Sequence, residues 1–167
     1  MMFQADSATG SLTAWYHRFW LGGEDWDLEV AGPMEARMFN RAATGEGILI
    51  FTGTHSGWFQ ITLRLIEEAP PVPSAEWEDV VRGSINLPEA ALWAVPTGSL
   101  GEEIELPLPS AGEYGFQIAA KGREDVDHEE DDSPEAYLID IWPATQMGES
   151  TVLRMTSEFG QTEFEGL

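Results

Sequence analysis

The chain has 167 residues, no cysteine, and 30 acidic residues against eight basic ones, which gives a formal net charge of −22. The absence of cysteine excludes disulfides, cysteine-based zinc sites and thiol nucleophiles. The charge argues against binding to DNA, RNA or an anionic membrane surface, because the counterion release that drives such binding requires a basic protein. An apolar fraction of 43% is enough for the core of one folded domain.

No apolar run approaches the length of a membrane span. The first ten residues lack the charged and apolar regions of a signal peptide. We therefore expect a soluble, cytoplasmic protein with no membrane partner.

Short strands separated by turn residues are the dominant pattern along the chain. The clearest alternation runs over Trp58–Ile66, where Phe59 and Ile61 face one way and Trp58 and Gln60 face the other. In chain order, the predicted strands lie within Leu12–Leu21 and at Ile48–Thr52, Trp58–Ile66, Trp77–Leu87, Leu92–Val95, Ile104–Leu108, Gly112–Ala120 and Tyr137–Trp142.

This spacing of strands and turns predicts an all-β fold, an antiparallel β-sandwich or flattened barrel of about eight strands. One helical turn is predicted at Pro33–Asn40. We assign residues 1–143 to a single sandwich domain. Residues 144–167 are interpreted as an acidic C-terminal extension that is partly disordered or adds an edge strand.

A run of acidic residues, Glu124–Asp132, lies between the last two predicted strands and carries seven carboxylates and no base. Such a density repels itself, so a role other than fold stability is expected for it. Without this run and residues 144–167, nineteen acids and seven bases remain, so the body keeps a net charge of −12. Long connections of this kind are usually functional or disordered.

Catalytic and metal-binding patterns are weak. The three histidines are scattered, and no nucleophile elbow, phosphate-binding glycine loop or zinc-protease motif is present, so we expect no enzyme and no cofactor. The alternation of four acids resembles the early ligands of a calcium loop, but Ala136 stands where the last ligand belongs. No dedicated metal site is therefore assigned, although a loose Ca²⁺ or Mg²⁺ site stays open at Asp125, Asp127, Glu129 and Asp131.

Two alternatives to a partner-binding role remain. The seven tryptophans would suit a carbohydrate- or small-ligand-binding sandwich, with Trp58 as the stacking platform because it stands on the polar face of its strand. A uniformly acidic chain with a single lysine, Lys121, would also suit adaptation to high salt.

Mimicry of nucleic acid is the third reading of the acidic run. In an extended segment, residues two apart lie roughly 6.8 Å apart on one face, so alternate acids form a regular row of negative charge. Phosphates along a nucleic-acid strand form a comparable row. A basic cleft built for phosphates could accept such a row, with electrostatic steering of the encounter.

Several segments resemble the competence protein J family, whose members are small acidic inhibitors of a DNA-entry nuclease. The resemblance covers roughly residues 13–143 and implies a sandwich-like fold and binding to a nuclease. It rests on Trp15-Tyr16-His17-Arg18-Phe19, Trp58–Leu65, Trp77-Glu78-Asp79-Val80-Val81, Leu108-Pro109 with Gly112-Glu113-Tyr114, and Ala136-Tyr137-Leu138-Ile139-Asp140.

The sequence therefore predicts a non-enzymatic inhibitor or immunity-type protein that occupies the basic cleft of a nuclease or of another nucleic-acid-binding protein. A DNA mimic directed at a defence or regulatory protein would share these electrostatics and differ only in its target. The predicted binding residues are Glu124, Asp125, Asp127, Glu129, Glu130, Asp131 and Asp132, supported by Trp58, Glu102, Glu103 and Glu105.

Overall fold

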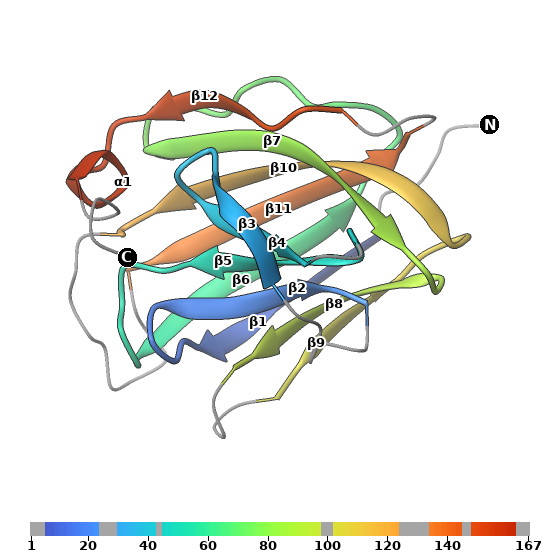
Figure 1. Cartoon of the computed structure of the whole chain (residues 1–167), viewed down its shortest axis with the longest axis horizontal. Coiled ribbons are helices and arrows are strands. Elements are labelled where there is room, and N and C mark those ends of the chain that lie inside the picture. Colours follow the sequence, from blue (N-terminus) through green and yellow to red (C-terminus); the bar gives the residue numbers. More distant parts are fainter. Residues whose placement is uncertain are drawn as a thin grey trace.

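The computed structural model of the chain describes residues 6–23, 30–42, 45–97, 102–123, 134–144 and 148–162. These residues form two mostly antiparallel sheets that pack face to face and do not close into a barrel (Figure 1). The predicted all-β sandwich is confirmed.

The first layer, sheet A, has six strands in the spatial order β1-β6-β11-β10-β7-β12. All neighbours are antiparallel except β11 and β6, which run parallel. Its strands are β1 (Asp6–Thr13), β6 (Trp58–Leu65), β7 (Asp79–Leu87), β10 (Gly112–Lys121), β11 (Ala136–Pro143) and β12 (Thr151–Met155).

The second layer, sheet B, has the order β3-β4-β5-β2-β8-β9 and is antiparallel throughout. Its strands are β2 (Arg18–Gly22), β3 (Val30–Glu35), β4 (Phe39–Ala42), β5 (Gly47–Phe51), β8 (Ala91–Pro96) and β9 (Ile104–Pro107).

The predicted helical turn at Pro33–Asn40 is wrong, because this segment is the hairpin of β3 and β4. Ala36 and Arg37 both have positive φ, 52° and 54°, and the Met38 amide donates to the Glu35 carbonyl at 3.0 Å. Two successive positive φ angles make the tight turn whose twist suits a hairpin. Neither residue is glycine or asparagine, so no turn signal is present there in the sequence.

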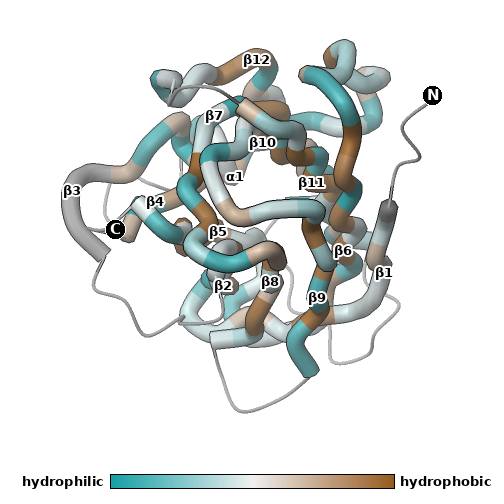
Figure 2. Tube along the Cα trace, turned by 90° about the vertical axis from the view of Figure 1, so that its right-hand side faces the viewer, coloured by the Kyte–Doolittle hydropathy of each residue, from teal (hydrophilic) through white to brown (hydrophobic). Residues whose placement is uncertain are grey.

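The core lies between the two sheets and is built from alternate residues of each strand. In β6 the alternation is complete: Phe59, Ile61, Leu63 and Leu65 are buried, and the intervening residues are half-buried. Hydrophobic residues recur along β6, β10 and β11 (Figure 2). The rings of Phe19, Phe59 and Tyr137 meet at centroid distances of 4.8–5.4 Å and join the two sheets.

The C-terminal part of the described chain packs onto the sandwich. β12 lies along β7 at the edge of sheet A, and the short helix α1 (Glu158–Thr162) follows it. Arg37, in the β3–β4 turn, donates from Nη1 to the carbonyls of Gly160 and Gln161 at 3.3 and 2.9 Å. Helix α1 is therefore fixed to sheet B as well as to sheet A.

Within the described ranges, no helix is both long enough and apolar enough to cross a membrane.

Candidate functional site

The acidic run connects β10 to β11 at one end of sheet A. Glu124–Asp132 itself lies outside the described residues, but the chain is described up to Arg123 and again from Pro134. Lys121, the last residue of β10, pairs with Ala136, the first residue of β11. The two strands therefore bring both ends of the acidic run to the same place.

Five residues close the base of this connection: Gly53, Gly122, Arg123, Pro134 and Glu135, which we call the neck. Gly122 has a φ of +71°, and a Cβ placed on it would collide with the Pro134 carbonyl. A Cβ on Gly53 would collide with the Arg123 carbonyl. Only glycine allows these backbones to approach so closely. The outgoing and returning chains are thus in direct contact.

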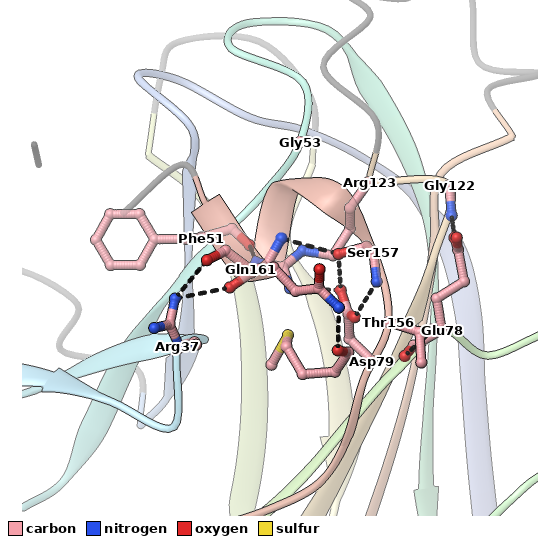
Figure 3. A network of polar contacts seen from close by, with 12 residues as sticks. Arg37, Phe51, Gly53, Glu78, Asp79, Gly122, Arg123, Thr156, Ser157 and Gln161 are labelled. Carbon is pink, nitrogen blue, oxygen red and sulfur yellow. Dashed lines mark hydrogen bonds and ion pairs between the residues drawn. The ribbon is translucent and has the colours of Figure 1, made fainter. Parts of the chain in front are cut away.

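A buried ion pair holds the outgoing side of the neck. Arg123 and Asp79 are both completely buried, and Nη1 of Arg123 lies 2.8 Å from Oδ2 of Asp79. Nη2 of Arg123 donates to the Phe51 carbonyl at 3.0 Å (Figure 3). The ring of Phe159 covers the guanidinium, with its centroid 4.8 Å from Cζ. Replacing such a buried pair by apolar groups is often neutral for stability, whereas removing one partner leaves an uncompensated buried charge and is strongly destabilising.

The chain around α1 completes the surroundings of Asp79. Ser157 donates to this carboxylate from its backbone amide at 3.1 Å and from its hydroxyl at 2.6 Å (Figure 3). Beside it, the Gly122 amide donates to Oε1 of Glu78 at 3.0 Å. These contacts join segments 78 residues apart at Asp79 and Ser157, and 44 residues apart at Glu78 and Gly122.

A buried carboxyl group holds the returning side of the neck. Glu135 accepts hydrogen bonds from the amides of Gly53 and Thr54 at 2.8 and 2.9 Å, and from the Tyr137 hydroxyl at 2.5 Å. Burial raises the pKa of Glu135, although these hydrogen bonds and the charge of Arg123 act in the opposite direction. Burial and the neighbouring Glu135 also raise the pKa of Tyr137 well above its ordinary value.

The second element at this end is the turn that leads from β1 into the first residue of β2, Trp15–Arg18, which we call the aromatic turn. Tyr16 and His17 have φ angles of 53° and 62°, and the Trp15 amide donates to the Arg18 carbonyl at 3.2 Å. Positive φ is rare for bulky residues and costs about 1–3 kcal/mol at each position. The turn exposes 48% of Trp15 and 58% of Tyr16.

The aromatic turn is bonded to the segment between β5 and β6, residues 52–57. The His17 amide donates to the His55 carbonyl at 3.0 Å, and the Thr52 amide donates to the His17 carbonyl at 2.8 Å. The imidazole of His17 donates from Nδ1 to the Thr52 carbonyl at 3.0 Å. Its ring also lies edge-on to His55 and stacked on Phe159, with centroids 5.0 and 5.9 Å away.

Residues 52–57 therefore support both the neck and the aromatic turn. Gly53 and Thr54 bind the carboxyl of Glu135, and their neighbours Thr52 and His55 bind His17. The neck and the aromatic turn are therefore joined through residues 52–57, and the ends of β1, β5 and β10 that lead into them lie at the same end of the sandwich (Figure 1).

A shallow pocket of about 300 Å³ opens beside the aromatic turn, on the outer face of sheet B. Leu49, which pairs with Trp20 between β5 and β2, contributes apolar surface. No ion pair involves Arg18 among the described residues. The pocket is lined by Trp15, Tyr16, Arg18, Leu49 and Thr97.

The other predicted binding residues lie away from the neck or at its margin. Trp58 begins β6, is half-buried, and does not line the pocket. Glu102 and Glu103 are exposed just before β9, and Glu105 is exposed within it. The most exposed tryptophan among the described residues is Trp15.

Sequence reasoning missed the buried charges of the neck and the exposure of the aromatic turn. Arg123 and Glu135 flank an acidic run, so their charge suggested solvent rather than burial. The signal for Trp15 and Tyr16 was the aromatic cluster itself, although no glycine, proline or asparagine marked a turn there.

No group of three or more histidine, aspartate or glutamate side chains is arranged to hold a metal ion in the described ranges. The four acids for which a loose cation site was considered, Asp125, Asp127, Glu129 and Asp131, lie outside those ranges.

No protein-family model matches the chain, and neither does any curated protein. Two solved structures are similar to it. One is ComJ from Bacillus subtilis, described as the inhibitor of the DNA degrading activity of NucA, with 19% identity and a TM-score of 0.59 over 85% of this chain and 100% of ComJ. The other is described as crocagin biosynthetic gene J, with 19% identity and a TM-score of 0.57 over 84% of this chain and 99% of its own. The resemblance to the competence protein J family is thereby confirmed as a shared fold.

Proposed function

We propose that this protein is a non-enzymatic inhibitor that binds the basic DNA-binding cleft of a NucA-type nuclease through its acidic run. The observation that carries the proposal is the neck. Two fully buried charged residues and a pair of close glycine contacts hold the ends of a segment with seven carboxylates and no base.

Electrostatics supports this choice of partner. A basic cleft holds phosphates with arginine and lysine side chains, and carboxylates satisfy the same donors with charge-assisted hydrogen bonds. The acidic body adds a long-range field, since its net charge stays at −12 without the run and the C-terminal residues. Such a field accelerates encounter with a basic surface and weakens as salt is added.

The fold supports the nuclease class in particular. ComJ, which has the same fold, is described as an inhibitor of the DNA degrading activity of NucA. A closed base also suits inhibition, because a binding segment with fixed ends loses less conformational entropy when it engages a cleft.

The test is degradation of a fluorescent DNA duplex by purified NucA at increasing concentrations of the protein, in about 50 mM and about 300 mM salt. We expect inhibition at low salt that weakens at high salt, because the contacts proposed are ionic. Absence of inhibition at both salt concentrations would overturn the proposal.

A matched pair of variants tests the location of the contact. The first neutralises alternate acids of the run: Asp125→Asn, Asp127→Asn, Glu129→Gln and Asp131→Asn. The control removes the same charge at the other end of the strands: Glu68→Gln, Glu89→Gln, Glu113→Gln and Glu149→Gln. We expect the first variant to lose inhibition by at least about tenfold and the control to lose far less. Equal losses would show that net charge, rather than the acidic run, does the binding.

A further inference from the structure

The aromatic turn exposes the side chains that most often anchor protein interfaces. Trp15 and Tyr16 are about half exposed, and Arg18 beside them is exposed as well. Tryptophan, tyrosine and arginine are the residue types most enriched among interface residues that dominate binding energy. Large aromatic rings are otherwise mostly buried in folded proteins.

The conformation of the turn makes this exposure costly. Tyr16 has a left-handed φ, which glycine or asparagine adopts with less strain, and its ring gains little burial in return. Residues in strained backbone conformations persist only where the surrounding structure enforces them, and they cluster at functional sites. Folding stability alone does not account for a tyrosine here.

The aromatic turn is also held in place by residues 52–57 and by Phe159. The backbone of His17 is bonded on both sides to residues 52–57, and its ring stacks on Phe159. The Trp15 and Tyr16 rings contact each other edge-on at 5.0 Å. Aromatic groups fixed in this way lose little freedom when they bind.

The adjoining pocket indicates what these rings would contact. Its volume of about 300 Å³ is at the lower limit for small-molecule sites and has room for a protruding side chain. Trp15 and Leu49 make its surface apolar. The guanidinium of Arg18 forms an ion pair with no described carboxylate. It therefore suits an acceptor oxygen of the partner, next to the side chain that enters the pocket.

We infer that Trp15, Tyr16 and Arg18 form a second contact with the same nuclease, and that the pocket receives an apolar side chain from the rim of its basic cleft. This inference rests on the proposed function. The acidic run supplies steered association, and the aromatic turn supplies short-range contacts that slow dissociation. One partner can contact the acidic run and the aromatic turn together, because residues 52–57 fix the turn and the neck relative to each other.

Binding kinetics of immobilised NucA test this division. We expect Trp15→Ala and Tyr16→Ala each to raise koff by about tenfold or more while kon stays within about threefold. Neutralising the four alternate acids should instead lower kon and its dependence on salt. Val152→Ala, which trims an apolar side chain of similar exposure (43%) on β12, is the control and should change neither rate.

The outcomes separate the two proposals. If NucA binds and koff is unchanged in Trp15→Ala and Tyr16→Ala, the inference fails and the proposed function stands. If NucA does not bind at all, the proposed function fails.

Two other occupants of the pocket would also overturn the inference. A dimer in sedimentation equilibrium that becomes monomeric in Trp15→Ala would assign the surface to a second copy of the chain. Calorimetric binding of cellohexaose or chitohexaose that Trp15→Ala abolishes, without a change in NucA kinetics, would assign it to a carbohydrate.

Discussion

The neck and the aromatic turn both depart from the rule that charged side chains face solvent and large apolar ones are buried, each in a different way. The neck, together with Asp79 as the partner of Arg123, places charged groups inside the protein, where Arg123, Asp79 and Glu135 are completely buried. The turn places two large aromatic rings in solvent, at Trp15 and Tyr16. The two regions share residues 52–57 and one end of the sandwich. The buried charged groups maintain the geometry of this end, whereas the exposed rings remain accessible to a partner.

In the neck, each buried charged group has partners within the chain. Asp79 receives Arg123 and both donors of Ser157, and Glu135 receives two amides and a hydroxyl. In the turn, the backbone is satisfied internally while the rings of Trp15 and Tyr16 stay half exposed. We therefore expect changes in the neck to lower stability, and changes in the turn to lower binding alone.

The largest expected effect follows from removing one charge of the neck. Arg123→Met leaves Asp79 buried without its cation, so we expect a loss of about 3–5 kcal/mol in the free energy of unfolding, measured by urea denaturation. The control is Arg64→Met, which breaks the pair with Asp140 at 2.6 Å. Because Arg64 is 42% exposed, water can enter after its removal, and a smaller loss is expected.

A second variant keeps this test decisive. Arg123→Met combined with Asp79→Leu replaces the buried pair by apolar groups and should recover part of the loss, although Ser157 then lacks its acceptor. Equal losses in Arg123→Met and Arg64→Met would mean that burial of the neck charges has no special role.

An intermediate effect is expected from the close backbone contact of the neck. Gly122→Ala and Gly45→Ala both introduce a side chain at positive φ, 71° and 78°, which costs about 1–2 kcal/mol. Only at Gly122 does the new Cβ collide with another segment, since nothing lies near it at Gly45. We expect Gly122→Ala to cost about 1–3 kcal/mol more than Gly45→Ala in the same urea experiment. Identical costs would show that the neck opens freely.

The smallest stability effect is expected in the turn. Tyr16→Gly and Ala36→Gly each relieve a left-handed residue and each add chain entropy to the unfolded state, so both should change stability by less than about 1 kcal/mol. Only Tyr16→Gly should raise the koff of the NucA complex. A large loss of stability in Tyr16→Gly would show that Tyr16 stabilises the fold, as the charged groups of the neck do, and would contradict its assignment to binding alone.

The sequence predicted the sandwich where strands alternate clearly and failed where turns lack their usual residues. β6, β10 and β11 were predicted because one face of each is apolar and Gly or Pro bounds the run. The β3–β4 hairpin was missed because Ala36 and Arg37 adopt positive φ without glycine or asparagine. The parallel pairing of β11 with β6 depends on distant segments, which a local pattern cannot encode.

The candidate site was predictable only in its charge. A run of seven carboxylates is visible in any reading of the sequence, and it stays a predicted contact because it lies outside the described residues. The burial of Arg123 and Glu135 depends on Asp79 and on residues 53–54, which are more than forty residues away. Strand alternation identified an outward face at Trp58, which is half-buried, whereas the exposure of Trp15 is decided by a turn that the sequence did not signal.

The position of Ser157 and Phe159 after β12 has a consequence for synthesis. Ser157, which donates to Asp79, lies 78 residues after it in the sequence. Phe159, whose ring covers Arg123, follows two residues later. Because synthesis proceeds from the N-terminus, the sheets can begin to pair while the ribosome is still adding residues, but the Arg123–Asp79 pair is not covered by Ser157 and Phe159 until α1 has emerged. The end of the sandwich that we assign to the nuclease is therefore completed only after β12 has been made, and a chain that stops before Ser157 lacks the contacts of Ser157 and Phe159 there.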